Sequence, residues 1–440
     1  MNERHTGNDA KRQVTSSCHR FLKEALNIAV NCFGSTELPK RIIHSYVMEP
    51  SGPERYHIKQ LMYDELNMDV TWDRISSKLL SSESWAAAED SLQQYIDVHK
   101  IEPSGIWQHV VDRQYLMPLL RTYLEKTGSF VYRRQYAAKT INSMLRHLDS
   151  PDVEVSGIIV LEGFKAEHWF RLEPKLMVRP IEKSELLMLG RTDTLVGPGL
   201  SRGEHLPQTD WWICEARLWN PRGIAIRWNK VHDIADTLAL ALRAFKPGGV
   251  SIGLATTQLA SPFGMMGQLH GGMLQKIAVG ESRYILSSPE IPKFTAFWRR
   301  FRRLIEEPQH YLQVPIYRFR AAGTREKKED ALVDYVVGLE ALLGTKDERT
   351  ELGYHFRVRG SVLLARNKNE RKKHLAALWD LYDLRNRIVH GQVVPTEDLE
   401  KALPMAESAL RQVWNWYFTH WYSESDNRTA IARIHEDLVG

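Results

Sequence analysis

The stretch LYDLRNRIVHG, residues 381–391, combines polar side chains whose types and spacing can do chemistry. Its leucine and isoleucine residues recur every three or four positions, which predicts a helix. On an ideal helix, Asn386 and His390 lie on one face a turn apart, whereas Arg385 and His390 are separated by about 140°. Gly391 predicts a left-handed helix end directly after the histidine. The arginine therefore meets the imidazole only if its side chain wraps around the helix or the helix end is distorted.

The functional interpretation of this stretch is a metal-free phosphodiester site. An imidazole can take the proton of a ribose 2′-hydroxyl or give one to a leaving oxygen, and a guanidinium can hold a phosphate through two hydrogen bonds. His390 would act as general acid or base, Arg385 would bind the scissile phosphate, and Asn386 would orient the histidine or a phosphate oxygen. Because the 2′-hydroxyl is an internal nucleophile, this chemistry needs neither a metal nor another cofactor.

A purely structural interpretation explains the same residues. A histidine in the last turn of a helix stabilises the negative end of the helix dipole. Asp383 and Arg387, four residues apart, have the spacing of an ion pair on the helix surface. The residues by themselves leave both interpretations open.

Length and composition limit the class of protein. The chain has 440 residues, of which 43% are hydrophobic, enough for two or three domains with cores of their own. No stretch approaches eighteen unbroken apolar residues, and the polar start lacks the apolar segment of a signal peptide. The three cysteines are too few and too scattered for a disulfide framework or a Cys-x-x-Cys metal site. We expect a cytoplasmic protein with reduced cysteines and no membrane contact.

Positive charge is concentrated in the last third of the chain. The formal net charge is only +5, which permits a nucleic-acid partner without requiring one. Any one basic run is explained by a solvated helix face, but several together favour an anionic partner. The runs are FWRRFRRL (297–304), YRFRAAGTREKK (317–328), FRVRG (356–360) and ERKKH (370–374). From these and the central stretch, the candidates for RNA phosphate contacts are Arg359, Arg387, Lys372 and Lys373.

The periodicity of apolar residues predicts a multidomain α+β protein in three parts. Residues 1–150 are mainly helical, as in segments 84–100 and 105–128, where Ser84 and Gly128 have the character of a helix cap and a helix stop. Residues 151–290 form a mixed α/β domain of short β-rich runs around one helix, 231–245. Residues 291–440 form an all-α bundle, because long helical patterns are joined there by short polar loops.

Two further motifs are better explained by packing or chance than by a site. The aromatic run 413–422 can be imagined stacking on bases, but Leu410, Trp414, Tyr417 and Trp421 form one helical stripe. Such a stripe usually packs into a core or a partner subunit. GLSRG, residues 199–203, matches the nucleophile elbow of hydrolases, yet lacks the strand before it and the helix after it that this motif requires.

The segment from about Ala331 to Gly391 resembles the HEPN superfamily, and within it the ApeA-like HEPN group. Three ordered blocks carry the resemblance, and the last one fits the superfamily's R-x4-6-H motif. At Gly360 the group more often has alanine, a departure that we expect to affect packing rather than chemistry. The blocks are LVDYVVGLEALLG with Glu340, ELGYHFRVRGSVLL with Glu351, Tyr354 and Arg359, and LYDLRNRIVHG with Tyr382, Arg385, Asn386, His390 and Gly391.

The resemblance implies an all-α bundle that dimerises, so that the R-x4-6-H motifs of two subunits line a shared cleft. Many HEPN proteins are endoribonucleases in toxin–antitoxin, abortive-infection or antiphage systems. A dimer would also resolve the angular separation of Arg385 and His390, because the arginine of one subunit could complement the histidine of the other. The first 290 residues would then sense a trigger, phage-derived or other, and restrain the nuclease, an expectation that rests on domain layout alone.

A rival interpretation is a binding module without catalysis. In that case the bundle binds RNA or a partner protein, and His390 has a structural role. The sequence also leaves open whether Glu215 and Arg217 form a site or an ordinary ion pair. Alternate positions of a strand share one face, which favours the ion pair.

Overall fold

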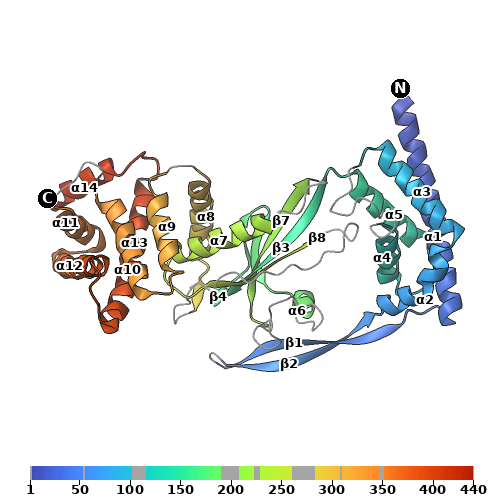
Figure 1. The fold of residues 1–440 in the computed structure, drawn as a ribbon, viewed down its shortest axis with the longest axis horizontal. Coiled ribbons are helices and arrows are strands. Elements are labelled where there is room, and N and C mark those ends of the chain that lie inside the picture. The colour runs from blue at the N-terminus through green and yellow to red at the C-terminus, as the bar shows by residue number, and fades with distance from the viewer. Residues whose placement is uncertain are drawn as a thin grey trace. The chain divides into compact units, whose positions relative to one another are not determined.

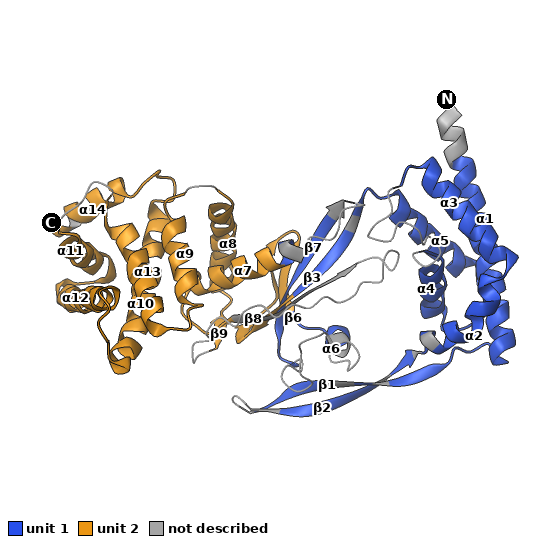
Figure 2. Cartoon of the chain, in the orientation of Figure 1, with its two compact units in different colours: residues 1–158, 180–231, 256–272 blue, residues 159–179, 232–255, 273–440 orange. Residues whose placement is uncertain are grey.

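The computed structural model describes residues 2–52, 55–101, 115–189, 208–221, 228–259, 283–307, 310–345 and 351–439 (Figure 1). Its fold is mixed α+β, with helices at the N-terminal end, an antiparallel sheet in the middle region and a C-terminal run of helices. This confirms the predicted fold class. By its internal contacts the chain divides into two compact units (Figure 2). Unit 1 comprises residues 1–158, 180–231 and 256–272, and unit 2 comprises residues 159–179, 232–255 and 273–440.

The predicted boundaries at 150 and 290 differ from the limits of these units. The middle region, residues 151–290, contributes segments to both units. The division into three domains therefore stays a prediction about which parts of the chain fold independently.

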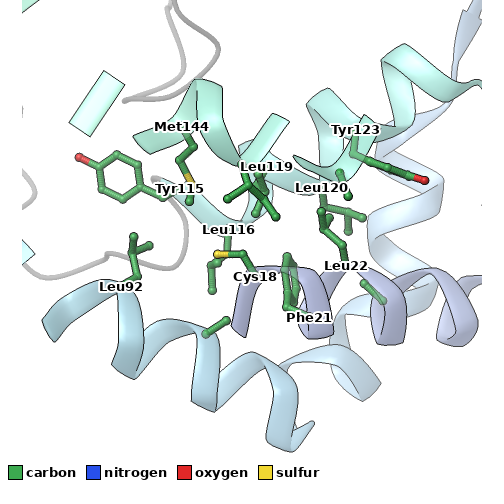
Figure 3. Close-up of a cluster of buried hydrophobic side chains, with 14 of the residues drawn as sticks. Cys18, Phe21, Leu22, Leu92, Tyr115, Leu116, Leu119, Leu120, Tyr123 and Met144 are labelled. Atoms are coloured by element: carbon green, nitrogen blue, oxygen red, sulfur yellow. The ribbon is translucent and has the colours of Figure 1, made fainter. Parts of the chain in front are cut away.

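Unit 1 contains a helical core. The longest helix carries apolar residues at three and four spacing, and its Cys18 and Phe21 are fully buried. They lie among leucine and aromatic side chains of the neighbouring helices (Figure 3). Burial raises the pKa of the Cys18 thiol to about 12, so this side chain behaves as a small apolar group. The helices are α1 (Asn2–Phe33), α2 (Met68–Leu80), α3 (Glu83–Val98), α4 (Met117–Thr127), α5 (Arg134–Asp149) and α6 (Lys183–Leu189).

The predicted ends of the N-terminal helices are partly correct. Gly128 ends α4 in the left-handed conformation, with φ of 63°, as its residue type indicated. The cap of α3 is Ser82, whose hydroxyl accepts a hydrogen bond from the backbone N–H of Trp85, and not Ser84, which is buried in the first turn. The first part of the predicted helix 105–128 lies outside the described residues.

An antiparallel hairpin in unit 1 was not predicted. Strands β1 (Lys40–Gly52) and β2 (Arg55–Leu66) pair over their whole length, starting with Lys40 opposite Leu66. The signal was present, because the sequence between the two strands, EPSGPE, is rich in turn-forming residue types.

The sheet of the middle region has the strand order β5–β6–β7–β3–β8. Strands β5 and β6 form an antiparallel hairpin, whereas the short β4 and β9 pair in parallel as a separate sheet. On β7, Arg217 Nε donates to Glu215 Oε1 at 2.9 Å, which confirms the ordinary ion pair. The strands are β3 (Asp152–Glu162), β4 (Phe164–Ala166), β5 (Phe170–Glu173), β6 (Leu176–Pro180), β7 (Trp212–Pro221), β8 (Ser251–Leu259) and β9 (Tyr284–Leu286).

The C-terminal helices of unit 2 pack around a buried aromatic stripe. Leu410, Trp414 and Tyr417 are at most 1% exposed, which confirms that the stripe packs in the core; Trp421, one turn on, is half-buried. The hydroxyl of the buried Tyr417 donates to the Leu342 carbonyl at 2.8 Å. The helices are α7 (Trp228–Phe245), α8 (Glu290–Glu306), α9 (Gln313–Ala322), α10 (Lys328–Leu343), α11 (Leu352–Leu364), α12 (Lys368–Val389), α13 (Thr396–His420) and α14 (Arg428–Val439).

Most arginines of the first two basic runs are bonded within unit 2. Asp334, which is 2% exposed, lies between Arg318 and Arg325, each 2.7 Å away. Arg302 pairs with Glu173 at 2.5 Å, and Arg320 pairs with Asp236. These ion pairs reduce the positive charge that the two runs present to a partner.

Among the helices of the described residues, none has the length and the apolar character that crossing a bilayer requires.

The start of α8 provides a pH-dependent contribution to stability. The Glu290 carboxylate accepts hydrogen bonds from Lys246 Nζ at 2.7 Å and from the Ser287 backbone N–H at 2.9 Å. These bonds lower the pKa of Glu290 from its ordinary value of 4.5 to about 2. Because the folded state holds the charged form more tightly than the unfolded chain, this stability is complete above pH 4.5 and is lost as the pH falls toward 2.

We expect Glu290→Gln to remove this dependence. Urea unfolding of wild type should show a free energy of unfolding that falls between pH 4.5 and 2 more steeply than in the variant. Glu397→Gln changes an exposed residue in the first turn of α13 and is the matched control. Its free energy of unfolding should depend on pH as that of wild type does. Equal pH dependence of all three proteins would contradict this role of Glu290.

Candidate nucleic-acid site

Helix α12 ends at the predicted position, in a defined C-cap. His390 is the cap residue, and Gly391 follows in the left-handed conformation with φ of 75°. The Gly391 N–H donates to the Ile388 carbonyl at 3.0 Å, and the Gln392 N–H donates to the Arg387 carbonyl at 2.8 Å. These two bonds form a Schellman motif, which satisfies carbonyls that a helix end otherwise leaves open. The backbone of His390 is therefore held in place, while its side chain is exposed.

We expect Gly391→Ala to destabilise this helix end. A left-handed conformation costs a residue with a Cβ atom about 1 kcal/mol, although no other atom within 4 Å opposes the added carbon. The urea midpoint of unfolding measures the effect. Gly391→Asn is the control, and its urea midpoint should fall less than that of Gly391→Ala, because asparagine tolerates the left-handed region. Urea midpoints equal to that of wild type in both variants would contradict a contribution of backbone conformation at Gly391 to stability.

Arg385 lies in the last turns of α12 and is bonded on the side of α10. Its Nη1 donates to Asn386 Oδ1 at 2.9 Å, and its Nη2 pairs with Glu340 Oε2 at 3.3 Å. The arginine side chain remains 24% exposed, and its buried Nε has no partner among the described residues. Burial raises the pKa of Glu340, and the positive charge of Arg385 opposes that shift. The guanidinium is thus oriented by two neighbours, and among the described residues its Nε–H is not used.

The structure brings Arg385 and Asn386 together, but it shows no hydrogen bond between Arg385 and His390. Within the described part of the chain, the His390 side chain makes no hydrogen bond or ion pair. The predicted ion pair of Asp383 with Arg387 is also not formed among these residues, so the purely structural interpretation loses one of its two supports. Arg387 itself is half-buried.

Arg359 is not placed to contact RNA, and this corrects the sequence-based prediction. Its side chain is 1% exposed; Nη1 donates to the Leu343 carbonyl at 2.6 Å and Nε donates to His435 Nε2 at 3.1 Å. A guanidinium enclosed in this way closes the C-terminal end of α10 and cannot reach a phosphate in solvent. Nearby, a Cβ at Gly360 would lie 2.7 Å from Leu378 Cδ1, so glycine fits the packing at this position.

The two candidate lysines are exposed but distant from the histidine. Lys372 and Lys373 lie in the first turns of α12. At the rise of an α-helix, Lys372 and His390 are separated by roughly 27 Å along the axis. These lysines can contact only a distant part of an RNA that is bound at His390.

A groove between α11 and α12 adjoins this site and was not predicted. Its volume is about 730 Å³, and Asn386 lines it together with Trp379, Tyr354 and Arg357. The carboxylates of Glu351 and Asp383 are also part of its lining. On α12 the lining residues follow a helical spacing, with Trp379, Asp383 and Asn386 three or four positions apart. This spacing places the three residues on one face of α12, but it does not show that α11 packs beside that face.

Other candidate sites find no support in the described residues. In the described part of the chain, no three histidine, cysteine, aspartate or glutamate side chains gather closely enough to hold a metal ion. The GLSRG motif lies outside the described residues. Comparison of the chain with known protein families, curated proteins and solved structures found no match. The resemblance to HEPN proteins therefore depends on the residues of its three blocks.

Proposed function

We propose that the protein is a metal-independent endoribonuclease of the HEPN type. His390 acts as general acid or base, Arg385 holds the scissile phosphate, and Asn386 positions the arginine. The observation that carries the proposal is the end of α12, where an exposed imidazole on a fixed backbone follows an oriented, partly exposed guanidinium within one R-x4-6-H motif. An imidazole can serve as general acid or base and a guanidinium can hold a phosphate, and neither role needs a metal.

The reaction follows from the RNA itself. A base takes the proton of the ribose 2′-hydroxyl, whose oxygen then bonds to the adjacent phosphorus atom. The bond from phosphorus to the 5′-oxygen breaks, and an acid protonates that leaving oxygen. The products carry a 2′,3′-cyclic phosphate and a 5′-hydroxyl, and the guanidinium stabilises the charge that develops on the phosphate oxygens.

The active form in this proposal is a homodimer joined through the C-terminal bundle. No hydrogen bond joins Arg385 and His390 among the described residues of one chain, and in this proposal a site that uses both draws them from two copies. Exposed aliphatic side chains flank the histidine, with Val389 54% and Val393 90% exposed. A second copy that covered them would bury apolar surface directly beside His390, which favours association.

The biological role in this proposal is that of a cytoplasmic effector in prokaryotic antiviral defence, through abortive infection, or in a toxin–antitoxin system. RNA is the substrate, and the first 290 residues sense a trigger, phage-derived or other. The support is the three-block resemblance together with the separate core of unit 1.

A non-catalytic RNA- or protein-binding HEPN module is the second candidate. The ion pair of Arg385 with Glu340 favours it, because a guanidinium already paired with a carboxylate binds phosphate less strongly. Incubation of the pure full-length chain with labelled single-stranded RNA in EDTA separates the two functions. Fragments with 2′,3′-cyclic ends support the nuclease. Retention of intact RNA, or no binding at all, would contradict it.

A further inference from the structure

The groove between α11 and α12 has an aromatic wall that is open to solvent. Trp379 is 52% and Tyr354 is 54% exposed. The centre of the Arg357 guanidinium lies 3.6 Å from the centroid of the Trp379 ring, and its Nε donates to the Gly353 carbonyl at 2.8 Å. The arginine is therefore fixed over one face of the indole ring. Flat cationic and aromatic groups in this arrangement are surfaces on which unstacked bases lie.

Two of the polar side chains that line the groove, Glu351 and Asp383, only accept hydrogen bonds when they are ionised. Glu351 and Asp383 are exposed, and among the described residues neither carboxylate forms a hydrogen bond or an ion pair. Carboxylates repel phosphate, so this pair does not suit the RNA backbone. Ionised carboxylates only accept, so they select a ligand with N–H donors.

Two backbone positions beside the groove, Glu351 and Gly353, are sterically restricted. Glu351 adopts a left-handed conformation with φ of 56°, which is unusual for a residue other than glycine. At Gly353 a Cβ would lie 2.9 Å from Cε1 of Tyr382, so only glycine lets this ring lie against α11. Strained residues of this kind are maintained where the surrounding structure requires a particular position.

We propose that this groove binds a guanine base of single-stranded RNA next to the scissile phosphate. Guanine presents N1–H and the N2 amino group side by side on its Watson–Crick edge, which matches two carboxylate acceptors. Adenine and cytosine each place a ring-nitrogen acceptor beside their single amino group, and uracil places carbonyl oxygens on both sides of its N3–H. Asn386 connects the groove to the phosphate site, because it lines the groove and its Oδ1 accepts from Arg385. The base preference rests on the proposed nuclease function.

The test compares the binding of short, 2′-O-methylated uridine oligomers that contain one guanine, adenine or cytosine, or none. These RNAs cannot be cleaved, so fluorescence anisotropy with the full-length chain reports affinity alone. The guanine oligomer should bind most tightly. Trp379→Ala should weaken its binding about tenfold, a typical loss for one stacked base. The double variant Glu351→Gln, Asp383→Asn should bind the four oligomers equally.

Matched controls separate these effects from a general loss of a surface residue. Trp169→Ala removes a 58% exposed tryptophan elsewhere, and Asp380→Asn removes an exposed carboxylate of α12 outside the groove. Both should retain the wild-type preference. Equal affinity of wild type for all four oligomers, or a preference that survives in the double variant, would overturn the inference.

Cleavage of the corresponding unmodified RNAs keeps this inference distinct from the proposed function. Selective binding of the guanine oligomer without any cleavage would contradict the nuclease function and support guanine binding in the groove. Cleavage with no dependence on the base would support the nuclease function and contradict guanine binding in the groove.

Discussion

Replacing His390 with alanine should lower the rate of RNA cleavage by about 10²–10⁴-fold, the contribution of a general acid or base. Replacing Arg385 with alanine should abolish measurable cleavage as well, because the developing charge on the phosphate then has no guanidinium partner. The measurement is the initial rate of cleavage of labelled single-stranded RNA in EDTA. Both variants should retain the far-ultraviolet circular dichroism of wild type, since His390 is exposed and Arg385 partly so.

The matched control for this pair is His374→Ala, which removes a histidine near the other end of α12. It should cleave RNA at the wild-type rate. Unchanged cleavage in both His390→Ala and Arg385→Ala would contradict the assignment of the site. An equal loss in His374→Ala would show that the assay responds to any change in this helix.

Replacing Arg359 with alanine should lower the free energy of unfolding by about 3 kcal/mol. The variant leaves the Leu343 carbonyl without its 2.6 Å donor and opens a cavity where a 1% exposed side chain was packed. The urea midpoint of the unfolding transition measures the loss. Arg366→Ala, an exposed arginine just beyond α11, is the control and should change the midpoint little.

The same pair of variants distinguishes a structural from an RNA-binding role of Arg359. If Arg359 closes the end of α10, the folded variant should bind RNA as wild type does at a temperature well below its unfolding transition. A variant as stable as Arg366→Ala that had lost RNA affinity would instead support the phosphate contact that the sequence indicated.

The long helices could be predicted because their apolar spacing is strong and local. The pattern at 231–245 and the end of α12 at Gly391 appear in the structure within a few residues of the expected positions. Hairpin β1–β2 was missed because its strands, of 13 and 12 residues, do not alternate strictly between apolar and polar residues. Cap positions were uncertain because several serines near the start of α3 satisfy the same preference, and only the hydrogen bond to Trp85 identifies Ser82.

The candidate site was only partly predictable for a related reason. The sequence places Arg385, Asn386 and His390 on one helix end, but it does not say that Glu340 of α10 pairs with the arginine. Arg357 and Arg359 are two positions apart and therefore point to different sides of α11, one over Trp379 and the other into the core. The groove depends on how α11 packs against α12, which periodicity along one helix does not reveal.

In the proposed dimer, the arginine of one copy and the histidine of the other act on the same phosphate. Mixing the Arg385→Ala and His390→Ala proteins, after a step that exchanges subunits, tests this shared site. In a mixed dimer, one of the two shared sites keeps both groups, so a statistical mixture should cleave RNA in EDTA at about a quarter of the wild-type rate. A mixture that forms dimers and still cuts no RNA would contradict a site shared between two copies.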